Sequence, residues 1–325
     1  PFSHSWAALH PQPKGVIQFV GGALVGTLPT LTYRHFLKSL FDAGYTVVAM
    51  PFRSTLRHWS IAIDLLDQHY TLRASLFEMA LAKGYESAVY VETASDAWIG
   101  HRLGCKFISL LELLSAPGEV LAGYFQERGE KERQLKEIQQ GLSCLSVRLR
   151  LVEKRIQQLT RQAVDYGRPS IMHQPSLLLA PAITDLDGAT PIKLLQQCFS
   201  KLLPVSPSVE HTHQLIEQSQ LFHLTGIAQF ARDRRTAVTC QRLMQEQPHL
   251  RRRLFKGNHL DPIGIQLGKF VVDFNPFDKF IQPLNCRDLE FKSLALLNCL
   301  RQVPSASCRQ TNRTKPLSTH HRLVA

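Results

Sequence analysis

The sequence predicts an α/β fold, with a mostly parallel β-sheet covered by helices on both faces and a helical insertion between its two halves. Short β-branched apolar runs, such as 15–20, 45–50 and 176–180, alternate with longer segments whose apolar residues have helical spacing. This alternation is typical of parallel strands joined by helical crossovers. The pattern is interrupted at about 118–172 by a long stretch with a different repeat. That interruption predicts the insertion.

The individual elements follow from apolar spacing and from the glycines and prolines that end each segment. The run 15–20 predicts a strand that ends at Gly21 and Gly22, and 45–50 predicts a strand closed by Pro51. The other predicted strands are 87–92, 97–100, 176–180, 222–230 and 250–255, and the predicted helices are 31–41, 59–82, 103–115, 214–220 and 238–245.

The insertion contains a regular apolar seam over 135–163. Its spacings alternate between three and four residues, at Leu135, Ile138, Leu142, Leu145, Leu149, Val152, Ile156, Leu159 and Ala163. Such a heptad-like pattern predicts one long helix with a single apolar face. Two interpretations stay open: an arm folded onto its own chain, or a seam for helix-mediated self-association.

Charge and composition narrow the possible partners. The chain of 325 residues has a formal net charge of +12, and the segment from Arg301 to the end contains basic residues but no acidic one. Nucleic-acid binding proteins usually place such charge on a folded face interleaved with aromatic residues. We therefore expect a folded domain over 14–300, followed by a disordered basic tail over 304–325. A basic nucleic-acid or membrane-surface binder remains a third, less favoured alternative.

The cysteines predict no metal site. The seven cysteines are scattered, without a CxxC pair or histidines at zinc-finger spacing, so reduced thiols and no cofactor are expected. No apolar run reaches the roughly 18 residues of a membrane span. These features suggest a soluble protein of the cytoplasm or plastid stroma. Because the sequence begins with Pro1 rather than Met, a targeting peptide upstream stays open.

A sharp strand-to-helix turn is predicted around Arg102. Gly100 and Gly104 flank it at distances of two residues, after strand-like sequence and before a helix. The G-x-S-x-G elbow of hydrolases needs small residues at these two places, so that the nucleophile can occupy a strained turn. The oxyanion-hole candidates are the backbone N–H groups of Gly22 and Ala23, after the first strand, and of Leu103, after the elbow position.

Asp233 and His259 complete the candidate constellation. Asp233 follows the predicted strand that ends at Phe230, and His259 follows the one that ends near Phe255. The order nucleophile, acid, histidine along the chain is that of the α/β-hydrolase triad.

These residues together resemble the cyanobacterial and plastid α/β-hydrolase-like family known as domain of unknown function 1350. The resemblance covers roughly residues 14–300 and is most specific in Gly15–Gly26, Ile99–Lys106, Gln174–Pro181, Leu221–Asp233 and Gly257–Phe280. It implies an α/β-hydrolase-like fold with a helical insertion before Gln174. The family has no settled substrate, so the resemblance implies a site layout and no particular reaction.

The chain departs from the family pattern at two positions. The family's G-H-S-L-G-C-K appears with Arg102 in place of the serine, and Ala231 replaces an aspartate near Asp233. Guanidinium cannot act as an acyl-forming nucleophile. We therefore expect a non-catalytic pseudoenzyme with a binding or scaffold role and a small acyl or anionic ligand. The alternative is a serine ester or acyl hydrolase whose elbow is altered in this sequence, by a real loss or a sequence variant.

Overall fold

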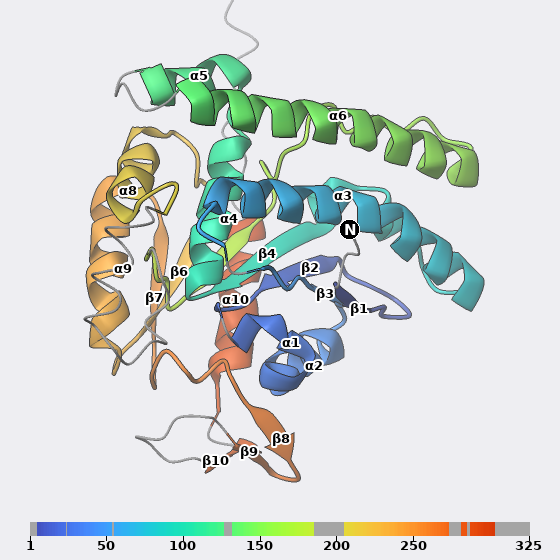
Figure 1. Cartoon of the computed structure of the whole chain (residues 1–325). Coiled ribbons are helices and arrows are strands. Elements are labelled where there is room, and N and C mark those ends of the chain that lie inside the picture. The colour runs from blue at the N-terminus through green and yellow to red at the C-terminus, as the bar shows by residue number, and fades with distance from the viewer. Residues whose placement is uncertain are drawn as a thin grey trace, which may run out of the picture.

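A computed structural model describes residues 5–23, 25–53, 55–126, 132–184, 205–272, 281–284 and 287–302. Its centre is a seven-stranded sheet of order β1-β3-β2-β4-β5-β6-β7 (Figure 1). The strands are β1 Trp6–Ala8, β2 Val16–Val20, β3 Thr46–Ala49, β4 Asp96–His101, β5 Ser176–Leu179, β6 Thr225–Phe230 and β7 Arg251–Phe255. Only β1 runs antiparallel to its neighbour, while every pair from β3 to β7 is parallel. The predicted mostly parallel sheet is confirmed.

Helices cover both faces of this sheet. They are α1 Pro29–Thr32, α2 Arg34–Asp42, α3 His58–Lys83, α4 Leu103–Leu114, α5 Gly118–Gln126, α6 Glu132–Thr160, α8 Val209–Gln218, α9 Arg234–Glu246 and α10 Leu289–Arg301. Successive strand residues point to opposite faces. One set packs with α3, α4, α8 and α9, and the other packs with α2 and α10. The strands are therefore buried on both sides, as their continuous apolar runs require.

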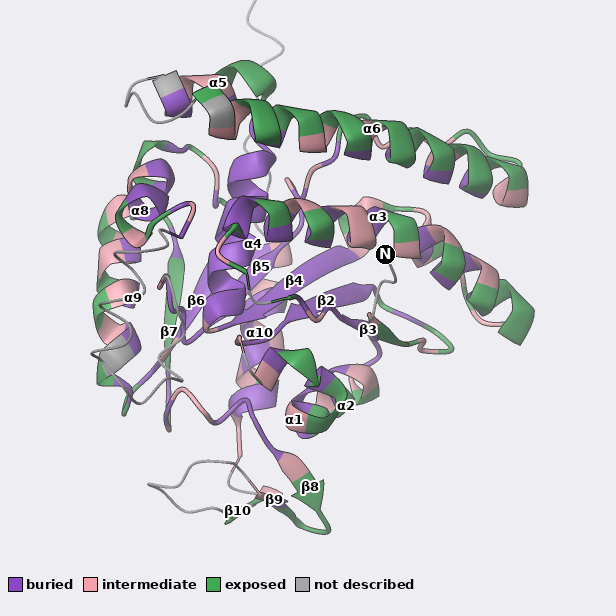
Figure 2. Ribbon diagram, viewed as in Figure 1, coloured by how far each residue is buried: buried purple, intermediate pink, exposed green. Residues whose placement is uncertain are grey.

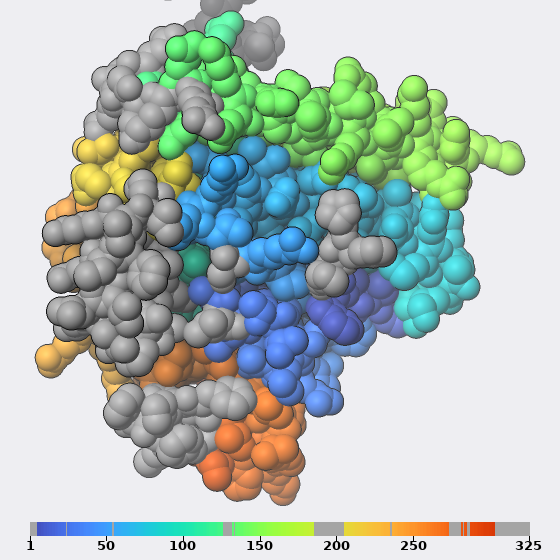
Figure 3. All heavy atoms as spheres, viewed as in Figure 1, coloured from blue at the N-terminus to red at the C-terminus, as the bar shows by residue number. Residues whose placement is uncertain are grey.

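The inserted helix α6 lies along α3 (Figures 1 and 2). Its seam residues Ile138, Leu145, Leu149 and Ile156 are buried, while the opposite side of the helix is exposed. The space-filling view shows the green arm resting directly on the blue and cyan surface of α3 (Figure 3). This packing supports the interpretation of an arm folded onto its own chain. Self-association through α6 stays a prediction.

Gly141 explains how closely these two helices approach. A Cβ atom at this position would lie 2.8 Å from Cδ1 of Ile63 on α3. The glycine costs about 1 kcal/mol in helix propensity relative to alanine. Its lack of a side chain makes room for the neighbouring helix.

Three parts of the architecture differ from the sequence prediction. Residues 87–92 do not form a strand but contain the 3-10 turn Ala88–Tyr90. The sheet gains the unpredicted edge strand β1, which lies before residue 14. A second small sheet, of β8 Ile265–Leu267, β9 Phe270–Val272 and β10 Ile281–Pro283, follows β7.

The tail 304–325 lies outside the described residues. Within the described part of the chain, none of the helices combines the length and the apolar character that a membrane crossing requires.

Candidate functional site

Arg102 occupies a sharp reversal between β4 and α4. Its backbone has φ 51° and ψ −116°, a conformation that non-glycine residues rarely adopt. Three backbone hydrogen bonds hold the turn. The N–H of Arg102 donates to the carbonyl of Leu179 at 3.1 Å, and its own carbonyl accepts from Cys105 at 3.0 Å and Ala182 at 3.2 Å. The Arg102 side chain therefore projects from the carboxyl end of β4, where the sequence predicted the nucleophile position.

The two flanking glycines are required by close backbone contacts. A Cβ atom on Gly104 would lie 2.1 Å from the carbonyl oxygen of Val20, and one on Gly100 would lie 2.9 Å from the amide nitrogen of Cys105. Real side chains do not tolerate such distances. The spacing of the glycines thus reflects the way α4 folds back over β2 and β4.

Asp233 and His259 contact each other at the neighbouring strand ends. Asp233 follows β6 and His259 follows β7, and Oδ1 of Asp233 lies 3.4 Å from Nδ1 of His259. The aspartate side chain is 1% exposed and the histidine side chain 20%. The buried carboxylate orients a histidine ring that remains open to solvent or to a ligand.

Asp233 also caps α9. Its Oδ1 accepts the N–H of Thr236 at 3.3 Å, and its Oδ2 accepts the Thr236 hydroxyl. Burial acts to raise the pKa of Asp233, but hydrogen bonds from His259 and Thr236 outweigh it and lower the pKa to about 2. The carboxylate is therefore ionised at neutral pH.

A chain of hydrogen bonds ties His259 to the elbow. Nε2 of His101 lies 2.7 Å from the carbonyl oxygen of His259, and its Nδ1 lies 2.7 Å from the hydroxyl of Tyr33. That hydroxyl accepts the N–H of Gly22 at 3.0 Å. Since a carbonyl can only accept, Nε2 of His101 carries a hydrogen, and in the neutral imidazole Nδ1 accepts from Tyr33. His101 directly precedes Arg102, so the histidine loop, the elbow and the first glycine loop meet in one place.

This network bears on the predicted oxyanion hole. The Gly22 N–H is engaged by Tyr33 rather than directed at a ligand. Ala23 is half-buried beside it. The N–H of Leu103, the first residue of α4, makes no backbone hydrogen bond to another described residue, as a helix N-terminus allows. The oxyanion-hole role of these three N–H groups stays a prediction.

The sequence did not predict a role in the site for Tyr33 or His101. Both are fully buried, and their contact joins positions that are 68 residues apart. The position of His101 beside the elbow was the one signal that could have suggested a role for it.

The described residues do not include a cluster of three or more His, Cys, Asp or Glu side chains arranged for a metal ion.

The strand order, the strained elbow and the Asp233–His259 pair at adjacent strand ends define an α/β-hydrolase-like fold. A family model described as Protein of unknown function (DUF1350) matches residues 2–123, which include the elbow. The resemblance to this family is confirmed over that segment. None of the curated proteins compared with the chain gave a match.

Several solved structures are similar to this chain at low identity. A propionate-bound esterase from Thermogutta terrifontis is 12% identical, with 93% of this chain and 91% of that chain covered and a TM-score of 0.44. Esterase B from Lactobacillus rhamnosis, inhibited by a tributyrin phosphonate, is 12% identical over 89% and 77%, with a TM-score of 0.45. A carboxylesterase from Lactobacillus plantarum WCFS1 is 12% identical over 78% and 79%, with a TM-score of 0.44.

Proposed function

We propose that this α/β-hydrolase-fold protein binds a small anionic or acyl ligand at the elbow and does not turn it over through an acyl-enzyme. The observation that supports the proposal most is the arginine at the strained tip, with φ 51° and ψ −116°. Guanidinium offers no lone pair for nucleophilic attack, so the histidine base has no hydroxyl to deprotonate.

Cys105 does not replace the missing nucleophile. It lies in the first turn of α4, is completely buried, and its thiol donates to the carbonyl of Leu179 at 3.4 Å. A substrate carbonyl has no route to this sulfur without disruption of the core. The neighbouring thiol therefore does not act as an acyl-forming nucleophile in place of residue 102.

Arg102 suits an anionic ligand because guanidinium binds carboxylates and phosphates with paired hydrogen bonds. Titration calorimetry with butyrate and with inorganic phosphate tests this role. We expect binding by the unmodified protein and a loss of about tenfold or more in Arg102→Ala, the range for hydrogen bonds to charged groups. Identical isotherms for the two proteins would rule out the elbow as the anion site.

The second candidate function is an ester or acyl hydrolase whose elbow has been altered, and the Asp233–His259 contact at 3.4 Å favours it. In that case Arg102→Ser is expected to restore covalent labelling by a fluorophosphonate probe. Labelling is expected to disappear again in the double variants that add His259→Ala or Asp233→Asn, which remove the base or its orienting partner. A folded Arg102→Ser protein that takes up no probe would show that the remaining groups do not form a working triad.

A further inference from the structure

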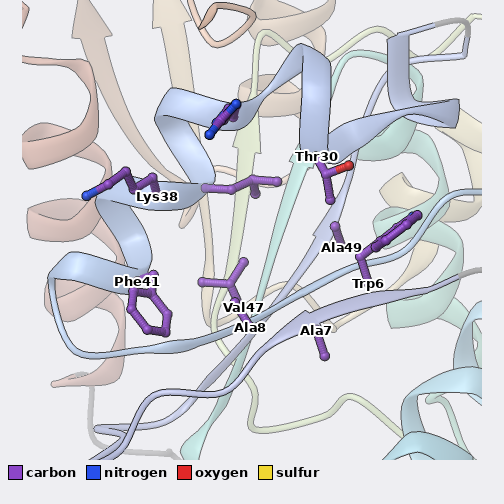
Figure 4. A pocket seen from close by; sticks show the side chains of 10 residues that line it. Trp6, Ala7, Ala8, Thr30, Lys38, Phe41, Val47 and Ala49 are labelled. Atoms are coloured by element: carbon purple, nitrogen blue, oxygen red, sulfur yellow. The ribbon is translucent and has the colours of Figure 1, made fainter. Parts of the chain in front are cut away.

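A hollow lies away from the elbow, between helix α2 and the edge strand β1 (Figure 4). Its volume is about 310 Å³, at the lower end of the range for small-molecule sites. The floor is apolar and formed by Leu37, Val47 and Ala49, all of them buried. Phe41 and the ring of Trp6 line the two ends.

The hollow exists because β1 carries one small side chain, that of Ala8, under α2. Trp6 pairs with Ala49 and Ala8 with Val47, so these side chains share the face of the sheet that α2 covers. Alanine at position 8 leaves space that a larger residue would fill. Trp6 at the end of this row is 56% exposed, an unusual position for so large an apolar ring.

Positive charge lines the rim of this apolar floor. Arg34 and Lys38 come from successive turns of α2 and both line the hollow. Lys38 is paired with Asp42 at 2.5 Å, whereas the Arg34 guanidinium makes no hydrogen bond or ion pair to another described residue. The hydroxyl-bearing Thr30 lines the same hollow.

From these features we propose that the hollow binds a free aliphatic carboxylate of medium chain length. The acyl chain packs on Leu37, Val47 and Phe41, and the carboxylate pairs with Arg34. An apolar floor with one available cation on its rim complements an amphiphilic anion in both shape and charge. A neutral ligand would leave the guanidinium unused, and a fully polar anion would leave the floor exposed to water.

This site is separate from the elbow. Three interstrand spacings separate β1 from β4 in the sheet, which corresponds to about 14 Å. Binding here therefore neither requires Arg102 nor depends on the function proposed for it.

Trp6 provides a direct readout. The chain has three tryptophans, and the other two, Trp59 and Trp98, are 5% and 0% exposed. We expect decanoate, kept below its micelle concentration, to shift Trp6 emission saturably. Octanoate, which is two methylenes shorter, should bind about fifteenfold more weakly, because each buried methylene contributes about 0.8 kcal/mol.

Variants test separately the charge of Arg34, the empty space beside Ala8 and the location of the site. Arg34→Ala should weaken decanoate about fivefold, and Ala8→Phe, which fills the hollow, should abolish binding while the far-UV spectrum stays unchanged. Arg150→Ala, which removes an exposed arginine on α6, is the matched control and should bind normally. Trp6→Phe should lose the optical signal but retain the heat of binding by calorimetry.

Four results would overturn the proposal. One is equal decanoate affinity for the unmodified protein and Ala8→Phe, and another is equal affinity of decanoate and 1-decanol. The third is a Trp6 shift with phosphatidylglycerol vesicles but none with decanoate, which would assign the surface to a lipid headgroup. Loss of decanoate binding in Arg102→Ala, with Arg34→Ala unaffected, would place the ligand at the elbow and so refute this site while supporting the other.

Discussion

Glu112 is a buried carboxyl group whose removal should stabilise the protein at high pH. It lies on α4, the helix that follows the elbow, and is 5% exposed. Its Oε1 accepts hydrogen bonds from Ser176 Oγ at 3.1 Å and Thr225 Oγ1 at 3.3 Å, at the first residues of β5 and β6. Burial raises the pKa of Glu112 from 4.5 to about 7, although the two hydroxyl hydrogen bonds lower it in part.

The size and sign of the effect follow from proton linkage. The folded protein holds the proton more tightly than the unfolded chain, so stability is greatest below pH 4.5 and falls as the pH rises through about 7. The full loss corresponds to about 3 kcal/mol, since a tenfold change in proton affinity is worth about 1.4 kcal/mol. Glu112→Gln keeps the shape and removes the ionisation. We expect it to match the parent protein at pH 4 and to exceed it by about 3 kcal/mol at pH 8.5.

Urea unfolding followed by circular dichroism, repeated between pH 4 and pH 8.5, measures this difference. Glu119→Gln is the control, because Glu119 is exposed on α5 and should give no pH-dependent gain. A difference between parent and Glu112→Gln that stays constant over the whole pH range would refute the reasoning, because it would show that the carboxyl titrates as it does in water.

Three further predictions concern the scaffold. Asp96→Ala should lower the free energy of unfolding in urea by about 3–5 kcal/mol, because it leaves the guanidinium of Arg73, 3% exposed, without its carboxylate partner. Gly104→Ala should destabilise the protein by several times more than Gly118→Ala in the same assay, since a Cβ at 104 meets a carbonyl oxygen at 2.1 Å and one at 118 meets nothing within 4 Å. Asp233→Asn should lower the free energy of unfolding by about 2 kcal/mol at pH 6 and by much less near pH 2. The pKa of this carboxyl in the folded protein is about 2, so its contribution to stability is present above pH 3.8 and is lost as the pH falls through 2. Equal losses of stability at both pH values would contradict this.

The sequence was sufficient for the features that depend on local pattern. The apolar runs 15–20 and 45–50 gave β2 and β3 almost to the residue, and the segment 59–82 gave α3. Burial on both faces makes such strands continuously apolar, which is a strong local signal.

Features that depend on partners distant in the chain were missed. The strand β1 is three residues long, and pairing with β3 rather than its own composition makes it a strand. Residues 87–92 have the composition of a strand, but Tyr90 turns inward to meet the hydroxyl of Thr46 at 2.6 Å. Tertiary contact overrides propensity in both places.

The candidate site also combines a feature that the sequence predicted with one that it did not. The glycine spacing around Arg102 was readable from the sequence, whereas the link from Tyr33 through His101 to the His259 carbonyl joins three separate segments. No local pattern encodes such a link.

The elbow also shows why geometry alone is no evidence of catalysis. A backbone such as that of Arg102 costs about 1–3 kcal/mol, and the turn would shed that cost if it relaxed. It does not, because the position of α4 over β2 is determined by contacts that do not involve the side chain at the tip. Gly104 packs directly on the Val20 carbonyl, and the backbone of Arg102 is held from β5 by Leu179. The strain is thus sustained by the packing of the fold, and it does not depend on which side chain occupies the tip.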